Sequence, residues 1–264
     1  MSDFGGQTVV ITGAAGGIGS AIARGFAARG ATLALLDIAD EPRQALAEEL
    51  RGAGATVLER HCDTGVEADI VSSIDTVESE LGGPHVLVNN AARGAHTRPE
   101  DLSTEEWNGV LAVSLTGYFL VARECGRRML AGGGGAIVNI ASIGGVNAIG
   151  RGNFVYDVAK AGVVQMTKDL ALEWARRGVR VNAVAPCQVL TPGLRGLLAD
   201  PKFEHDTLLA TFLRGIPIGR LANPEDVVGA VLFLASSDAA MTTGATLPVD
   251  GGNLAMNAGG SIPR

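Results

Sequence analysis

Short apolar runs alternate along the chain with longer segments whose apolar residues recur at helical spacing. The first run covers residues 8–12, and Ile18, Ile22 and Phe26 then recur every fourth residue, as on one face of a helix. Further strand-length runs cover residues 32–36, 56–60, 85–88, 136–140, 179–184 and 247–249. The segments expected to be helical cover residues 41–51, 67–81, 103–129, 154–176 and 224–234. This alternation predicts an α/β fold, a Rossmann-like doubly wound parallel sheet of about seven strands with helices on both faces.

Two of the expected helices begin with recognisable capping signals. Ser103-Thr104-Glu105-Glu106 has the pattern of a capping box, which predicts one long helix through Met129. Asn223 followed by Pro224 has the pattern of a cap and a first-turn proline. Both signals support the helical assignment of the segments that follow them.

The alternation of strands and helices is interrupted once, over residues 191–215. We expect this stretch, near residues 190–215, to form a small helical lobe over the carboxyl end of the sheet. No Pro- or Ser-rich linker and no repeat of fixed period divides the chain. Residues 1–264 are therefore expected to form a single domain.

Composition and charge narrow the functional classes. The 264 residues carry a formal net charge of −7, which argues against a nucleic-acid-binding protein. No apolar stretch is long enough to cross a bilayer, and the first residues lack the pattern of a secretory signal. The three cysteines are far apart and the four histidines are scattered, so no metal site is expected. The cysteine pattern is typical of a reducing cytoplasm, where we expect the protein to act.

A glycine-rich segment lies between the first strand and the first helix. Gly13, Gly17 and Gly19 permit a tight turn and let the backbone approach a pyrophosphate at the helix N-terminus. Ala15 and Ile18 belong to the same loop. Their position between a strand and a helix predicts a dinucleotide-binding loop.

An acidic residue, Asp37, ends the second strand. A carboxylate at this place accepts hydrogen bonds from an adenosine ribose and repels a 2′-phosphate. Neither Ala15 nor Ile38 is basic, so neither could pair with that phosphate. The sequence predicts NAD, rather than NADP, as the cofactor.

A tyrosine and a lysine stand four residues apart in the segment 154–176. Tyr156 and Lys160 lie on the same face of the expected helix. A phenol ionises near a pH of about 10, and a neighbouring ammonium favours the phenolate. The pair is a candidate device for proton transfer.

Further motifs follow the other strands in order. Cys62-Asp63 follows the third strand, Asn89-Asn90-Ala91-Ala92 the fourth, and Ser142 the fifth; Asn182 and Pro186 lie in and after the sixth. With the closing Val249-Asp250-Gly251-Gly252, they resemble the short-chain dehydrogenase/reductase family in its compact single-domain form. The resemblance covers nearly the whole chain.

The resemblance implies roles for these residues. Tyr156 would be the general acid/base, Lys160 would hold the nicotinamide ribose and lower the tyrosine pKa, and Ser142 would orient the reacting oxygen. The residues that it assigns to the cofactor are Gly13, Ala15, Gly17, Ile18, Gly19, Asp37, Cys62, Asp63, Asn90, Ala91, Tyr156, Lys160, Pro186, Val189 and Thr191.

The chain departs from the family pattern at two places. Ser114 stands where the family usually has an asparagine that supports a water-linked proton relay to the lysine, so its membership of the catalytic set is in question. Cys187 follows Pro186 in place of a glycine, and we interpret it as a small filler with an inert thiol.

Polar residues follow several strand ends and predict a polar substrate. The candidate contacts are Arg93, Ser142, Gly144, Arg151, Asn153 and Gln188. Arginine suits carboxylate or phosphate groups, so the expected substrate is a polar secondary alcohol: a sugar, a polyol or a hydroxy acid, anionic ones included.

Several alternatives remain open at the level of sequence. They are a dehydrogenase of a hydrophobic or cyclic alcohol or diol, and a non-catalytic NAD-binding sensor. An enoyl reductase is disfavoured, because family members of that kind space the tyrosine and lysine farther apart. The family resemblance also implies a homo-oligomer, commonly a tetramer.

Overall fold

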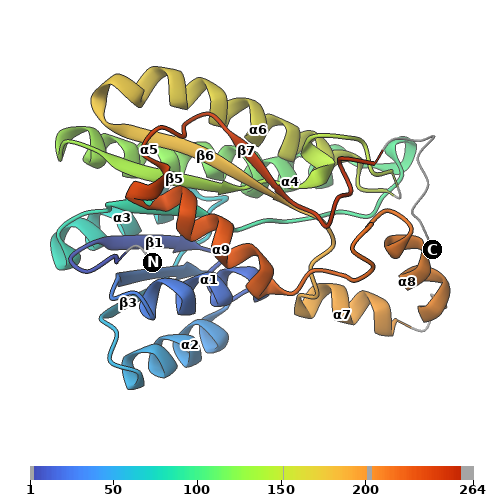
Figure 1. Cartoon of the computed structure of the whole chain (residues 1–264), viewed down its shortest axis with the longest axis horizontal. Helices are drawn as coiled ribbons and strands as arrows, with labels where there is room; N and C mark the ends of the chain where they lie inside the picture. Colours follow the sequence, from blue (N-terminus) through green and yellow to red (C-terminus); the bar gives the residue numbers. More distant parts are fainter. Residues whose placement is uncertain (1–2, 151, 201–203, 257–264) are drawn as a thin grey trace.

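A sheet of seven parallel strands forms the centre of the molecule. The computed structural model describes residues 3–150, 152–200 and 204–256 (Figure 1). The strand order is β3-β2-β1-β4-β5-β6-β7, and every pairing is parallel. The strands are β1 Thr8–Thr12, β2 Thr32–Asp37, β3 Val57–His61, β4 Val86–Asn89, β5 Gly135–Ile140, β6 Val179–Pro186 and β7 Thr246–Val249. The predicted seven-stranded fold is confirmed.

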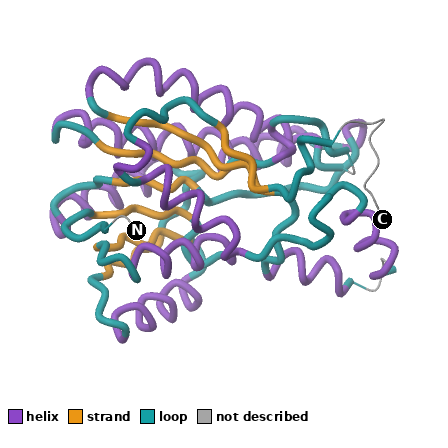
Figure 2. The backbone as a smooth tube through the Cα atoms, in the orientation of Figure 1, coloured by secondary structure: helices purple, strands orange, loops and turns teal. Residues whose placement is uncertain are grey.

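Helices cover both faces of this sheet (Figure 2). Alternation along β1 explains the two layers, since Val9 and Ile11 belong to one buried cluster and Val10 to the other. The first cluster takes in α1 (Gly17–Ala27), α2 (Asp40–Gly52) and α9 (Pro224–Ala235). The second takes in α3 (Glu67–Leu81), α5 (Gly117–Ala131) and the end of α6 (Phe154–Trp174).

The strand order reverses at β1, and this reversal places the loops after β1 and β4 together. The Asn90 amide donates hydrogen bonds to the carbonyl oxygens of Thr12 (3.1 Å) and Gly13 (2.9 Å). The Thr12 hydroxyl accepts one from the Asn90 backbone at 3.0 Å. In open α/β sheets, such a switch point is where ligands bind.

The expected single helix over residues 103–129 is interrupted. It consists of α4 (Thr104–Leu111), a π-helical turn η2 (Ala112–Thr116) and α5. A π turn inserts one extra residue without changing the helix-forming character of the sequence, and such turns are frequent at functional sites. The prediction of one unbroken helix was wrong for that reason.

The start of α4 also differs from the expected capping box. The Ser103 hydroxyl accepts a hydrogen bond from the Glu106 backbone at 3.1 Å, as expected. The Glu106 carboxylate, however, accepts a hydrogen bond from the Thr97 hydroxyl at 2.8 Å. Glu106 therefore bonds to Thr97 in a neighbouring loop, and not to the Ser103 backbone N–H as in a capping box.

Two short helices lie beyond one end of the sheet, where Figure 1 shows them in orange. They are α7 (Pro192–Ala199) and α8 (His205–Leu213), and they share a small apolar cluster with Ile216 and Leu221. The loop before α7 is tied to the segment before α9, because Leu190 donates to the Ala222 carbonyl and Ala222 to the Gln188 carbonyl. These two bonds hold the loop against the segment before α9.

The described residues contain no helix of the length and apolarity that a bilayer span requires. Within the same residues, no group of three or more His, Cys, Asp or Glu side chains is placed to hold a metal ion.

Candidate active site

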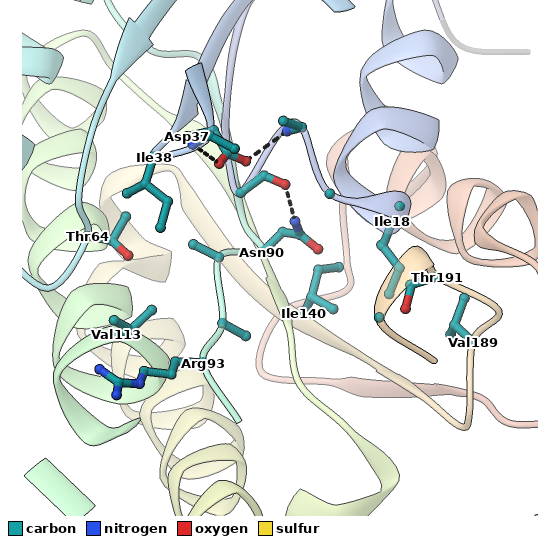
Figure 3. Close-up of a pocket in the computed structure, with 18 of the residues that line it drawn as sticks. Ile18, Asp37, Ile38, Thr64, Asn90, Arg93, Val113, Ile140, Val189 and Thr191 are labelled. Atoms are coloured by element: carbon teal, nitrogen blue, oxygen red, sulfur yellow. Dashed lines mark hydrogen bonds between the residues drawn. The ribbon is translucent and has the colours of Figure 1, made fainter. Parts of the chain in front are cut away.

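A cavity of about 950 Å³ lies at the carboxyl edge of the sheet, beside the switch point. Figure 3 shows residues from the glycine loop, the ends of β2, β4 and β5, and the loop after β6 around it. Nearly all the residues predicted to bind the cofactor line it: Gly13, Ala15, Gly17, Ile18, Asp37, Cys62, Asp63, Asn90, Ala91, Tyr156, Lys160, Pro186, Val189 and Thr191.

Gly19 differs from the other predicted cofactor residues, because it lies beneath the loop. A Cβ at this position would collide with the Gly13 carbonyl oxygen and lie 2.9 Å from the Ala14 Cα. Its missing side chain allows α1 to pack closely on the loop. Gly13 has a φ of +61°, and a Cβ there would lie 2.7 Å from the Ala91 Cα, so this position also requires glycine.

The N-terminus of α1 fits an anion. Its N-cap, Gly16, makes no side-chain capping bond, and the first turn contains no acidic residue. Gly16, Gly17 and Ile18 all line the cavity. The positive end of the helix dipole and its first N–H groups thus suit a pyrophosphate.

The Asp37 carboxylate is fixed at the end of β2 (Figure 3). One oxygen accepts a hydrogen bond from the Ala15 backbone (2.8 Å) and the other from the Ala39 backbone (2.9 Å). Ile38 beside it is 60% exposed and also lines the cavity. A carboxylate and an apolar side chain are therefore neighbours in this part of the cavity wall.

The region after β3 has both polar and apolar groups. The Asp63 carboxylate accepts a hydrogen bond from the Gly65 backbone at 2.8 Å. Cys62 is buried, and its burial raises the pKa of the thiol. Thr64 and Val113 line the same part of the cavity, although the sequence reasoning missed them. Val113 reaches the cavity because it belongs to the π turn η2, and the sequence pattern that predicted site residues considered only the ends of strands.

Ser142, Tyr156 and Lys160 come together on the same cavity. Ser142 follows β5, and its hydroxyl accepts a hydrogen bond from the Gly144 backbone at 3.0 Å. Tyr156 is half-buried and Lys160 is 1% exposed, one turn apart on α6. The loop after β5 and the first turns of α6 thus bring the three side chains to one part of the cavity wall.

Burial dominates the electrostatics of this group. It raises the pKa of Tyr156 to about 12, with a further rise from the Asp157 charge and an opposing effect of the hydrogen bond with Ser142. Burial also lowers the pKa of Lys160 to about 7. The sequence predicted a tyrosine pKa lowered by the lysine. The loss of hydration instead disfavours the charged form of both groups.

Two groups that the sequence reasoning missed hold the Lys160 ammonium. Its nitrogen Nζ donates hydrogen bonds to the Tyr118 hydroxyl and to the Ile140 carbonyl, both at 2.8 Å. The sequence did offer one signal for Tyr118, because it lies four residues after Ser114 and therefore on the same face of a helix.

Ser114 is fully buried, and its hydroxyl is engaged elsewhere. It accepts a hydrogen bond from the Arg93 backbone N–H (2.9 Å) and donates one to the Arg93 carbonyl (2.8 Å). This serine therefore fixes the loop after β4, and its proton points to that loop.

The predicted substrate residues are dispersed. Arg93 lines the cavity, but its guanidinium lies against α4, so that a Cβ at Gly109 would be 2.9 Å from it. Figure 3 shows the Arg93 side chain on the Val113 side of the cavity, away from Val189. Gly144 is buried, and its backbone N–H donates to the Ser142 hydroxyl. Asn153 precedes α6, where its carbonyl accepts a hydrogen bond from the Asp157 backbone. Arg151 lies outside the described residues.

Gln188 lines a second cavity of about 340 Å³. The two cavities adjoin, because Ser142 and Cys187 line the first and their next neighbours Ile143 and Gln188 line the second. The Gln188 Oε1 atom is buried without a hydrogen-bond partner. The other residues that line this cavity are Asn147, Ala148, Ile149, Thr211, Phe212, Arg214, Gly215 and Asn253.

Comparison with known proteins places this geometry in a family. A family model described as enoyl-(acyl carrier protein) reductase matches residues 13–253. A D-threitol dehydrogenase from Mycolicibacterium smegmatis is 40% identical over 94% of this chain and 92% of its own. A cis-4-hydroxycyclohexanecarboxylate dehydrogenase from Sinomonas cyclohexanicum is 42% identical over 96% of this chain and 98% of its own.

A solved structure is similar over nearly its whole length. It is a gluconate 5-dehydrogenase from Burkholderia cenocepacia in complex with NADP and tartrate. Its TM-score is 0.88 at 31% identity, with 97% of this chain and 98% of that one covered. The chain described here belongs to the short-chain dehydrogenase/reductase family. It is an oxidoreductase of the alcohol dehydrogenase type, and its family binds a nicotinamide cofactor.

Proposed function

We propose that the protein is an NAD-dependent dehydrogenase that interconverts a polar secondary alcohol and its carbonyl. The observation that carries this proposal is the convergence of Ser142, Tyr156 and Lys160 on the cavity of about 950 Å³, directly beside a second, polar cavity. The first cavity would hold the cofactor and the reacting carbon, and the second the distal part of the substrate.

The chain's own residues would move the proton. A nicotinamide cofactor, when bound, accepts or supplies the hydride. Ser142 donates a hydrogen bond to the substrate oxygen and orients it. Tyr156 takes the hydroxyl proton during oxidation and returns it during reduction. Lys160 holds positive charge behind the phenol and stabilises the phenolate that accepts this proton during oxidation.

Two observations at Asp37 support NAD over NADP. Its carboxylate is held at the cavity wall by the Ala15 and Ala39 backbones, and the neighbouring Ile38 offers no positive charge. A 2′-phosphate would meet a fixed negative charge there. The related gluconate 5-dehydrogenase structure contains NADP, whereas we expect kcat/KM of this chain to be higher with NAD than with NADP.

The second cavity supports a polyol or hydroxy acid as substrate. The buried Gln188 Oε1 is an acceptor without a partner, and a substrate hydroxyl could donate to it. Asn147 and Asn253 add amide groups, and the exposed Arg214 stands at the rim. An apolar alcohol would leave the Gln188 oxygen unsatisfied, whereas a polyol hydroxyl could donate to it and a substrate carboxylate could pair with Arg214.

The experiment is a turnover screen that follows NADH formation. The panel contains threitol, galactitol, gluconate and cis-4-hydroxycyclohexanecarboxylate, with cyclohexanol as the apolar alcohol.

Tyr156→Phe should lower kcat by about a hundredfold or more, because it removes the proton acceptor. Gln188→Leu should lower kcat/KM for the polyols and leave kcat/KM for cyclohexanol unchanged. The substrate proposal fails if apolar alcohols are turned over better than every polar one.

A cyclic hydroxy acid is a second candidate, favoured by the relative that is 42% identical. It differs from an open-chain polyol in requiring one anion contact, for which Arg214 is placed. Arg214→Gln should then raise KM for the cyclic acid far more than for threitol. A sensor remains the alternative in another functional class, and binding of NAD without turnover of any panel member would favour it.

The assembly and location are also part of the proposal. Exposed apolar side chains lie on α5 and α6, among them Phe119, Val158 and Leu172. Their burial between copies would support the homotetramer expected from the family, which light scattering of the purified protein tests. We also propose a cytoplasmic location, consistent with the free thiols of Cys62, Cys125 and Cys187.

A further inference from the structure

Tyr118 is one of the two tyrosines in the chain, and it has no part in the sequence-based site. It is 2% exposed on α5, and it does not line the cofactor cavity. Its hydroxyl accepts a hydrogen bond from Lys160 Nζ at 2.8 Å and donates one to the Ile140 carbonyl at 3.0 Å. Because Lys160 also donates to that carbonyl, the three groups form a closed triangle behind the site.

The structure fixes Tyr118 firmly in this place. The Asn89 amide donates hydrogen bonds to the Tyr118 carbonyl (3.1 Å) and to Asn139 Oδ1 (3.0 Å). Asn139 in turn donates to the Thr167 hydroxyl at 2.9 Å. The Tyr118 ring also lies under the ammonium, with 4.4 Å between Nζ and the ring centroid, a distance at which cation–π attraction operates.

Ser114 makes a different pair of contacts. Its hydroxyl accepts from the Arg93 backbone N–H and donates to the Arg93 carbonyl, so both bonds hold it to the loop after β4. The residue four positions later on the same helical segment, Tyr118, is the one that reaches Lys160.

We propose that Tyr118 is a positioning residue for Lys160, whose hydroxyl holds the ammonium at the site in place of the group expected at position 114. This rests on the proposed function, in which Lys160 supports Tyr156. Two of the three N–H groups of Lys160 are taken up by Tyr118 and Ile140. The third remains for the cavity, where cofactor and substrate would bind.

The groups around Lys160 determine the sign of the expected effect. Tyr118 faces it from α5 and Tyr156 from α6, while β5 provides the Ile140 carbonyl. The Asp157 carboxylate, next to Tyr156 on the same helix, accepts a hydrogen bond from the Ile149 backbone. Removing the Tyr118 acceptor destabilises the ammonium, so the pKa of Lys160 should fall further below its usual range.

The first test measures Lys160 without any enzymatic assay. The chain has three lysines, Lys160, Lys168 and Lys202, so protein labelled with ¹³C at the lysine Cε gives few NMR signals. Lys160→Met assigns the signal. Tyr118→Phe should lower the pKa of Lys160 by about one unit. Tyr118→Leu, which lacks the ring as well, should lower it at least as far.

Thr167→Val is the matched control, because it deletes a buried hydroxyl from the same network without touching Lys160. It should lower Tm and leave the pKa of Lys160 in place. An unchanged Lys160 pKa in both Tyr118 variants, or an equal change in Thr167→Val, would overturn the proposal. Neither result depends on whether a substrate has been found, so this test is separate from that of the proposed function.

A second test applies once a substrate is known. Alcohol oxidation needs the Tyr156 phenolate, so a weaker positive charge at Lys160 moves the acidic limb of the kcat profile to higher pH. In Tyr118→Phe we expect a shift of about one pH unit, and thus about a tenfold loss of kcat below that limb. KM for the alcohol should stay, since Tyr118 does not line the cavity. A raised KM with an unmoved limb would contradict the positioning role.

Discussion

The Ser114 hydroxyl holds both backbone polar groups of Arg93, accepting from its N–H and donating to its carbonyl. This pair of bonds joins the π-helical turn to the loop after β4. The loop lines the 950 Å³ cavity from Asn90 to Arg93. A side chain that the sequence associates with proton transfer thus determines the shape of the cavity wall.

Ser114→Ala should accordingly act through stability and binding. It leaves a backbone N–H and a carbonyl without their partner, at a cost of about 1–3 kcal/mol. Thermal melting should show a lower Tm, and the KM for the cofactor should rise while the pH profile keeps its shape. A shifted pH limb with an unchanged Tm would instead place Ser114 in the proton route.

Asp37→Ala should relax the cofactor preference. Removal of the carboxylate takes away the repulsion of a 2′-phosphate and an acceptor for the ribose, so the ratio of kcat/KM for NAD to that for NADP should fall about tenfold or more. Asp40→Ala is the control, because Asp40 is a nearby carboxylate that pairs with Arg43 and His61 and does not line the cavity. Equal efficiencies with the two cofactors in the unmutated enzyme would refute the prediction of NAD.

Lys160→Met should stabilise the cofactor-free protein, although it removes activity. The pKa of Lys160 is lowered to about 7 in the fold, whereas the unfolded chain keeps the ordinary, higher value. Between these values the unfolded state binds more protons, so the stability of the unmutated protein rises with pH across this window. Below about pH 7 Lys160 is charged in the folded protein, so the full free-energy cost of burying that charge lowers its stability. The gain from methionine should then be on the order of 1–4 kcal/mol, and it should shrink towards about pH 10.

Urea unfolding at about pH 6 and about pH 10 measures this difference. Lys168→Met, an exposed change on the same helix, serves as the control and should have little effect at either pH. A stabilisation by Lys160→Met that grows with pH would contradict the prediction.

Asp157→Asn should move the pH profile of alcohol oxidation to lower pH. The Asp157 charge raises the pKa of Tyr156, and asparagine keeps an acceptor for the Ile149 backbone without that charge. The phenolate then forms more readily, so the acidic limb of kcat should fall by up to about one pH unit. The isosteric change Asp169→Asn, farther along α6 and exposed, should leave the limb unmoved. A limb at higher pH in Asp157→Asn would contradict this account.

Periodicity predicted the seven strands and the layers of helices because burial on a sheet imposes a repeating pattern on each element. The glycine loop and Asp37 were found because short-range rules of turn and strand end place them. Tyr118 was missed, since its role depends on contact with Lys160, 42 positions along the chain. The π turn was missed because an inserted residue leaves no mark on helix propensity. The orientation of the Arg93 side chain was not predicted, because it depends on packing against Gly109 on α4, and a pattern of residues at strand ends carries no information about that contact.

The bond between the Asp37 carboxylate and the Ala15 backbone has a consequence for how the protein can diverge. The same side chain that would select the cofactor also braces the loop that would bind its phosphates. A single substitution at position 37 therefore loosens the loop while it alters selectivity. A lineage that changed its cofactor would have to acquire a new brace for Ala15 in the same evolutionary step, or pass through an intermediate that binds either cofactor weakly.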